Sequence, residues 1–270
     1  MRREAFTFGV VAIVLATGCS KLERLSIVKP TAERGDWKQV APKYEVSDKG
    51  RDAAPVAALQ LLALATEAYR AGKPDLAAQQ ARQALKIDPK LADAHNLLAA
   101  IASGQGDAAA AGRHYQQALA LAPDAGAYAN NYGTWLCANG RAMESLGWFE
   151  KALADLNYPT RAAAFANAGS CANRAGLAER AEANWRQALA LEPDELQSLA
   201  GMAALQYGRA QYLDARAFAE RWLALAPLDP EGLQLASQIE LKLGDTAASA
   251  RYLHKLQALP AGAANIPRAQ

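Results

Sequence analysis

Several kinds of residue that carry chemistry or bind charged partners are scarce in this chain. Its 270 residues include only three histidines and three cysteines, and aromatic residues make up 7%. Lysine and arginine number 29 against 27 acidic residues, which leaves a formal net charge of +2. This balance excludes the basic stripe of a nucleic-acid-binding protein and the polybasic patch of a peripheral membrane protein.

Catalytic motifs are also missing. The sequence contains no glycine-rich phosphate loop, no nucleophile elbow and no zinc-binding histidine pair. The acidic residues Glu179, Glu182, Asp194 and Glu195 fit solvated helix faces and caps better than a catalytic carboxylate pair. We therefore expect a protein that is not an enzyme, has no small-molecule substrate and uses no cofactor.

Residues 1–18 have the features of an export signal. Two arginines precede an apolar run from Ala5 to Leu15, and about 11 apolar residues are too few to span a bilayer as a helix. Residues 15–19 (LATGC) resemble a bacterial lipobox, which implies cleavage before Cys19 and a covalent lipid on its sulfur. By the same resemblance, Ser20 implies sorting to the outer membrane, with the protein facing the periplasm. An ordinary secreted protein is the alternative.

The segment that follows Cys19 has mixed charge, prolines and glycines but no helical apolar period. We interpret residues 19–54 as a semi-flexible tether between the lipid and a folded domain. Trp37 and Tyr44 within it could dock on the domain or on a partner, or belong to a disordered leash.

A glycine then returns at nearly constant intervals. Gly72, Gly106 and Gly140 are 34 residues apart, and Gly176 follows after 36. Alanines at 84, 118, 152 and 188 keep the same intervals, and prolines close the units. A period of 34 residues with alanine in the second half and a closing proline is typical of tetratricopeptide repeats (TPRs).

The repeats predict an all-α fold, a right-handed superhelical array of about six TPR helical hairpins over residues 55–260, followed by a tail at 261–270. Small residues let the helices approach closely, and an aromatic such as Trp185 fills the gap to the next repeat. Repeat five departs from the pattern, because Ala210 stands in the turn. We expect His95, His114 and His254 to lie in different repeats as surface residues, with no metal bound, because no ligand stands at suitable spacing.

Cys137 and Cys171 are the one pair with possible covalent chemistry. Both fall on first helices of adjacent repeats, so their α-carbons could come within the roughly 7 Å that a disulfide needs. An oxidising periplasm would favour the bond. Two buried free thiols are the alternative.

The concave side of such an array is lined by first helices and is the candidate binding groove. In repeat one the groove positions hold Leu59, Leu62, Thr66 and Tyr69, which could anchor a partner or be covered by the segment around Val56. Farther along, the groove becomes polar, with amides that could hold a peptide backbone or only join neighbouring helices. These polar candidates are Asn96, Asn130, Asn131, Asn167, Asn173 and Arg174.

Three local motifs are more specific than generic repeat residues. Residues 130–133 (NNYG), the Tyr158-Pro159 junction and residues 167–169 (NAG) resemble the PilF/PilW family of type IV pilus biogenesis lipoproteins. The resemblance implies a pilotin, an outer-membrane lipoprotein whose groove binds the secretin, the ring channel of the pilus machine. It leaves open whether the protein acts on secretin assembly or on stability.

Two other functions fit the same features. One is a periplasmic TPR adaptor lipoprotein for assembly of the cell envelope. The other is a regulatory subunit of a periplasmic enzyme.

Overall fold

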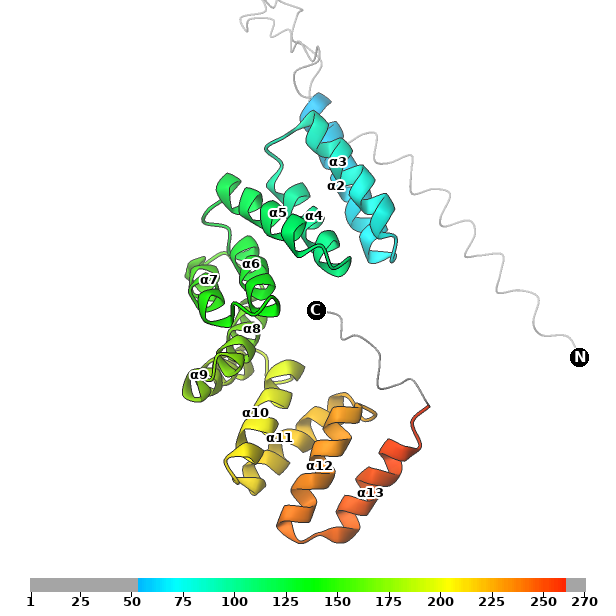
Figure 1. Cartoon of the computed structure of the whole chain (residues 1–270), viewed down its shortest axis with the longest axis vertical. Coiled ribbons are helices and arrows are strands. Elements are labelled where there is room, and N and C mark those ends of the chain that lie inside the picture. Colours follow the sequence, from blue (N-terminus) through cyan, green and yellow to red (C-terminus); the bar gives the residue numbers. More distant parts are fainter. Residues whose placement is uncertain (1–52, 261–270) are drawn as a thin grey trace, which may run out of the picture. The chain divides into compact units, whose positions relative to one another are not determined.

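The computed structural model describes residues 53–260, and every regular element within them is a helix (Figure 1). The helices are α2 (Ala53–Arg70), α3 (Pro74–Ile87), α4 (Ala92–Gly104), α5 (Ala108–Leu121), α6 (Gly126–Ala138), α7 (Ala142–Ala154), α8 (Arg161–Arg174), α9 (Ala178–Leu191), α10 (Leu196–Gly208), α11 (Tyr212–Leu225), α12 (Pro230–Leu243) and α13 (Thr246–Gln257). The first begins two residues before the expected start of the repeat domain. None of these helices is long and apolar enough to cross a membrane.

Several of the sequence predictions concern residues outside this range. They are the export signal, the lipidation site Cys19, the tether up to residue 52 with Trp37 and Tyr44, and the tail at 261–270. These remain predictions.

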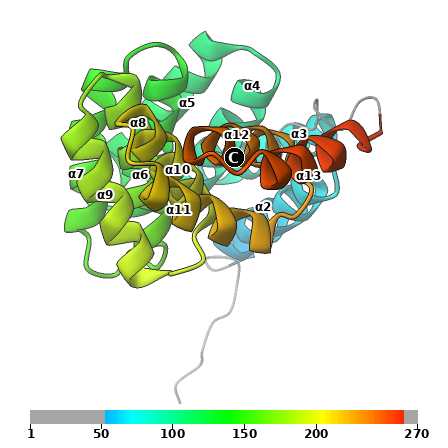
Figure 2. The ribbon, with the colours of Figure 1, turned by 90° about the horizontal axis from the view of Figure 1, so that it is seen from below.

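Consecutive helices pair as six hairpins, from α2 with α3 to α12 with α13. Each hairpin packs against the next, and the first helices also contact one another in the series α2, α4, α6, α8, α10 and α12. In Figure 2 the second helices α7 and α9 lie outside the first helices α6 and α8. The prediction of an all-α superhelical array of about six helical hairpins is confirmed.

The turn inside each hairpin explains the glycine interval. Gly72, Gly106, Gly140, Gly176 and Gly244 occupy this turn, with φ between 70° and 86°. This left-handed region costs an L-residue about 1–2 kcal/mol, whereas glycine enters it freely. In the fifth hairpin Ala210 takes the same place with a φ of 58°, and within residues 53–260 it is the one non-glycine residue at positive φ.

Replacing Ala210 by glycine should therefore stabilise the protein. Relief of the left-handed strain exceeds the greater entropy of glycine in the unfolded chain, so we expect a gain of about 0.5–1 kcal/mol in the free energy of unfolding. Denaturant melts measure the change. Ala204→Gly, an exposed site inside α10, is the matched control and should cost about 1 kcal/mol. A loss of stability in Ala210→Gly would contradict the strain argument.

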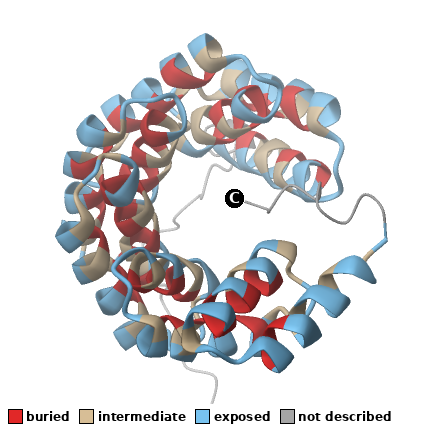
Figure 3. Ribbon diagram, turned by 60° about the horizontal axis from the view of Figure 1, so that its bottom comes forward, coloured by how far each residue is buried: buried red, intermediate tan, exposed pale blue. Residues whose placement is uncertain are grey.

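Aromatic side chains fill the seams between hairpins, where glycines make room for them. Trp185 on α9 is 2% exposed and lies between Gly169 of its own hairpin and Gly201 of the next. A Cβ atom added at either glycine would stand 2.5 Å from the indole. Phe149 lies against Gly133 of its own hairpin, where an added Cβ would stand 3.1 Å from the ring. In Figure 3 the buried residues lie on the sides of the helices that face other helices, and the outer turns are exposed. The close approach of the hairpins therefore depends on glycines, which have no side chain to keep them apart.

Gly201→Ala should destabilise the protein, because its methyl group would overlap the buried indole of Trp185. Overpacking of this kind costs about 1–3 kcal/mol. Gly147→Ala is the control, since no atom lies within 4 Å of the added methyl and the site is inside α7. There we expect a gain of up to about 1 kcal/mol from helix propensity. Equal effects of the two substitutions on thermal unfolding would contradict the conclusion that Trp185 needs the space left by Gly201.

The last hairpin exposes apolar side chains that earlier hairpins bury. Leu253 stands nine residues after its turn glycine, as Trp185 does, yet it is 40% exposed. Leu241 is 54% exposed, whereas Cys137, three residues before its own turn glycine, is 3% exposed. Their exposure follows from position, because no further hairpin follows α13 among the described residues.

Candidate protein-binding groove

A depression of about 620 Å³ lies between the first helices α2 and α4. Its lining residues are Leu59, Leu62, Ala63, Thr66, Tyr69, Arg70, Asp93, Asn96, Leu97 and Ala100. Its walls are mainly apolar, and Leu59 is 54% exposed to solvent. Burying such side chains against a partner would gain about 25 cal/mol for each Å² of apolar surface removed from water.

The depression, which we call the α2/α4 groove, collects five residues that the repeat register had placed on the concave side: Leu59, Leu62, Thr66, Tyr69 and Asn96. Leu59 and Tyr69 are exposed, and Leu62, Thr66 and Asn96 are half-buried. The sequence positions therefore come together in one surface, while the partner they would contact stays a prediction.

Four of the predicted asparagines form a chain of side-chain hydrogen bonds across three first helices. Asn167 on α8 donates to Asn130 on α6 (3.2 Å), and Asn130 donates to its neighbour Asn131 (3.3 Å). Asn131 then donates to Asn96 on α4 (3.0 Å). Each amide thus joins its own helix to a neighbouring one or to the next amide.

This chain of amides bears on the two roles considered for the asparagines. Asn130 is 8% exposed and bonds to two other amides, so it lies in the seam between helices. Asn96, Asn131 and Asn167 are half-buried, and an amide can make more bonds than these residues use here. The asparagine side chains therefore join helices. The half-buried amides of Asn96, Asn131 and Asn167 also keep hydrogen-bonding capacity for a peptide.

Asn173 and Arg174 are not part of the amide chain. Both are exposed at the carboxyl end of α8, and neither side chain makes a hydrogen bond or ion pair with a described residue. They also lie outside the α2/α4 groove.

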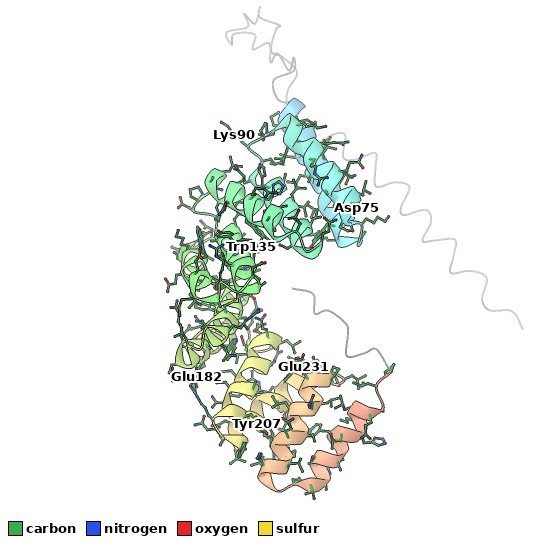
Figure 4. The ribbon with its side chains drawn as sticks, viewed as in Figure 1. Asp75, Lys90, Trp135, Glu182, Tyr207 and Glu231 are labelled. Atoms are coloured by element: carbon green, nitrogen blue, oxygen red, sulfur yellow. A yellow bond between two sulfur atoms is a disulfide. The ribbon has the colours of Figure 1, made fainter. Side chains whose placement is uncertain are left out.

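An aromatic cluster supports α6 beside the amides. Tyr132 stacks on Trp135 with ring centroids 5.4 Å apart and meets Trp148 edge-on at 4.9 Å. Trp135, labelled in Figure 4, also lies against Gly112 of the preceding hairpin. Gln116 donates a hydrogen bond of 3.2 Å to the Tyr132 hydroxyl. These contacts fix α6 against the second hairpin.

Two charged residues of the groove were missed by the sequence reasoning. Asp93 stands where repeat one has Leu59, so the repeat register could have found it, but Arg70 lies one residue past the positions assigned to the groove. The Tyr128 hydroxyl donates to the Asp93 carboxylate at 2.7 Å. Burial, with added effects of that bond and of the negative charge, raises the pKa of Tyr128 well above its usual value, so the hydroxyl stays protonated as a donor.

Comparison with known proteins places the chain among pilus proteins. PilW, a widely conserved type IV pilus biogenesis factor, has a solved structure that is 31% identical, with a TM-score of 0.70 over 79% of this chain and 95% of that one. The chain belongs to the PilF/PilW family of type IV pilus biogenesis proteins. No protein-family model matches it.

Other relatives agree with this assignment. The type IV pilus assembly protein PilF of Pseudomonas aeruginosa is 28% identical over 216 residues, which are 80% of this chain and 84% of PilF. A solved structure of that protein has a TM-score of 0.72 at 25% identity, over 76% of this chain and 92% of that one. A tetratricopeptide repeat protein of Parabacteroides merdae shares the fold alone, with a TM-score of 0.60 at 16% identity over 77% of this chain and 83% of that one.

The histidine prediction needs one correction for this PilF/PilW family member. His95 on α4 and His114 on α5 lie in the same hairpin, not in different repeats, and their Nδ1 atoms are 3.1 Å apart. Burial lowers the pKa of both rings, and for His114 the nearby His95, Arg113 and Arg82 lower it further. Within residues 53–260, no three histidine, cysteine or acidic side chains are grouped to hold a metal ion.

Cys137 on α6 and Cys171 on α8 form a disulfide, with their α-carbons 5.8 Å apart. Both are buried, at 3% and 4% exposure. The bond joins the third and fourth hairpins of this PilF/PilW relative, on the same two helices as the Asn130–Asn167 bond. It therefore holds together the helices that carry the middle of the amide chain.

Reduction of this disulfide should destabilise the fold. The bond closes a loop of 34 residues, which constrains the unfolded chain by about 3–4 kcal/mol in the chain-entropy estimate. We expect a lower melting temperature with reductant, measured in a Cys19→Ala variant to exclude exchange with the third sulfur. A further Cys137→Ala and Cys171→Ala double replacement should melt equally with and without reductant. Alkylation of Cys137 or Cys171 without reductant would show that the bond is absent.

Proposed function

We propose that this PilF/PilW family member is a pilotin, an outer-membrane lipoprotein that binds a secretin subunit of the type IV pilus machine. The lipid on Cys19 provides membrane attachment, and the α2/α4 groove holds the secretin. In this role the protein is a non-catalytic scaffold that promotes outer-membrane localisation, multimer assembly or stability of the secretin.

The exposed apolar α2/α4 groove, in a chain of this family, is the observation that carries the proposal. Side chains such as Leu59, exposed on a concave surface, do not stabilise the protein on its own. A partner that covered them would lower the free energy by removing apolar surface from water. The lipobox resemblance at residues 15–19 supports the anchor, because several acyl chains on one cysteine attach a protein stably. A cell-envelope adaptor or a regulatory subunit would use the same surface with a different partner.

Complementation of a deletion strain tests both parts of the proposal. Cys19→Ala should keep the thermal stability of the fold but leave the outer-membrane fraction. Leu59→Glu should stay in that fraction yet fail to restore secretin multimers and twitching motility, because a carboxylate would be desolvated against an apolar partner. Membrane fractionation, gel analysis of multimers and motility assays measure these outcomes.

Leu213→Glu is the matched control, because Leu213 on α11 is 69% exposed and lies outside the groove. It should complement fully. Normal secretin multimers in the deletion strain would exclude the pilotin role and favour the adaptor. Outer-membrane retention of Cys19→Ala would exclude the lipid as the anchor.

A further inference from the structure

The α2/α4 groove has opposite charges at its two ends. α2 and α4 are first helices of successive hairpins and run in the same direction, since one antiparallel helix separates them. Asp93 is the second residue of α4, and Arg70 is the last residue of α2. A carboxylate therefore marks the amino end of the groove and a guanidinium marks its carboxyl end.

Both charged groups have bonding capacity to spare. The Asp93 Oδ1 atom accepts from Tyr128, which orients the carboxylate and leaves Oδ2 without a donor among the described residues. Arg70 is exposed, and its side chain makes no hydrogen bond or ion pair with any residue of the described range. An apolar floor formed by Leu59, Leu62 and Leu97 separates the two groups.

This arrangement matches the ends of a docked α-helix. A helix leaves free N–H groups at its amino end and free C=O groups at its carboxyl end, with partial positive and negative charge. A carboxylate such as Asp93 accepts from the first, and a guanidinium such as Arg70 donates to the second. Leu59 and Arg70 are eleven residues apart on α2, which corresponds to about 16 Å at 1.5 Å per residue.

We propose that the α2/α4 groove holds one amphipathic helix of about eleven residues, with its amino end at Asp93 and its carboxyl end at Arg70. The inference rests on the proposed function, in which the partner is the secretin. Leu59, Leu62 and Leu97 receive the apolar face of the helix, as in other helix-in-groove complexes. The reverse orientation would place carbonyl oxygens against a carboxylate and N–H groups against a guanidinium, so the groove selects one direction.

Overlapping synthetic peptides that cover the secretin of the same bacterium are suitable probes, with affinity for the full folded chain measured by fluorescence anisotropy. Arg70→Gln and Asp93→Asn should each weaken the best peptide about three- to tenfold, the range expected for caps and helix-dipole contacts. Asp93→Asn keeps an acceptor for Tyr128. Exposed charges outside the groove give the controls Arg82→Gln and Asp214→Asn, which should change affinity less than about twofold.

Peptide ends then report the direction of binding. The ratio of the affinities of free and acetylated peptides should fall in Asp93→Asn, because the ammonium loses the carboxylate while its unfavourable effect on the peptide helix is unchanged. The same fall in Arg70→Gln instead, or equal binding by all variants, would overturn the proposed helix while leaving secretin binding intact. If no peptide and no intact secretin bound the wild-type chain, the proposed function itself would be wrong.

Discussion

The close approach of neighbouring hairpins is the constraint on which the rest of the structure depends. It is set by an aromatic ring in each central seam and by glycines that offer no Cβ to it, as Gly169 and Gly201 do for Trp185. A seam of this kind fixes the distance between successive first helices, because a close-packed interior does not deform continuously. Since those first helices line the concave side, the same packing that stabilises the array also positions the α2/α4 groove and the amide chain.

The irregular interval between Gly140 and Gly176 changes how the third and fourth hairpins are joined. In the connection between α7 and α8, Asp155 accepts hydrogen bonds from the backbone N–H groups of Gly126 and Asn157, and these bonds hold the pKa of its carboxyl below the usual range. The connection is thus attached to the start of α6. The disulfide between α6 and α8 adds a covalent bond between the third and fourth hairpins.

Much of this fold was predictable from the sequence, because each hairpin needs the same residue types at the same positions and the pattern therefore recurs several times. The turn glycines, the seam aromatics and the proximity of Cys137 to Cys171 all follow from register alone. The hydrogen bonds between the asparagines did not follow from register. Register tells which side of a helix a residue faces, but not whether two amides are close enough to bond. His95 stands eleven residues before Gly106 and His114 eight after it, so the register already places both in one repeat and the prediction of different repeats was wrong. The contact between their rings depends on the side-chain positions of both helices of the hairpin, which register does not give.

Along the array, the groove positions differ in whether their side chains already have partners within the protein. In α6 and α8 the polar side chains bond to one another, so a partner that displaced those bonds would gain little net free energy. In α2 the equivalent positions hold Leu62 and Ala63, whose apolar side chains line the groove and make no such bonds. Covering apolar surface lowers the free energy because it removes that surface from water, and this effect does not depend on which apolar partner covers it. In the function proposed above, covering Leu59 and Leu62 in the α2/α4 groove therefore drives association. The amide chain contributes by joining α4, α6 and α8 to one another.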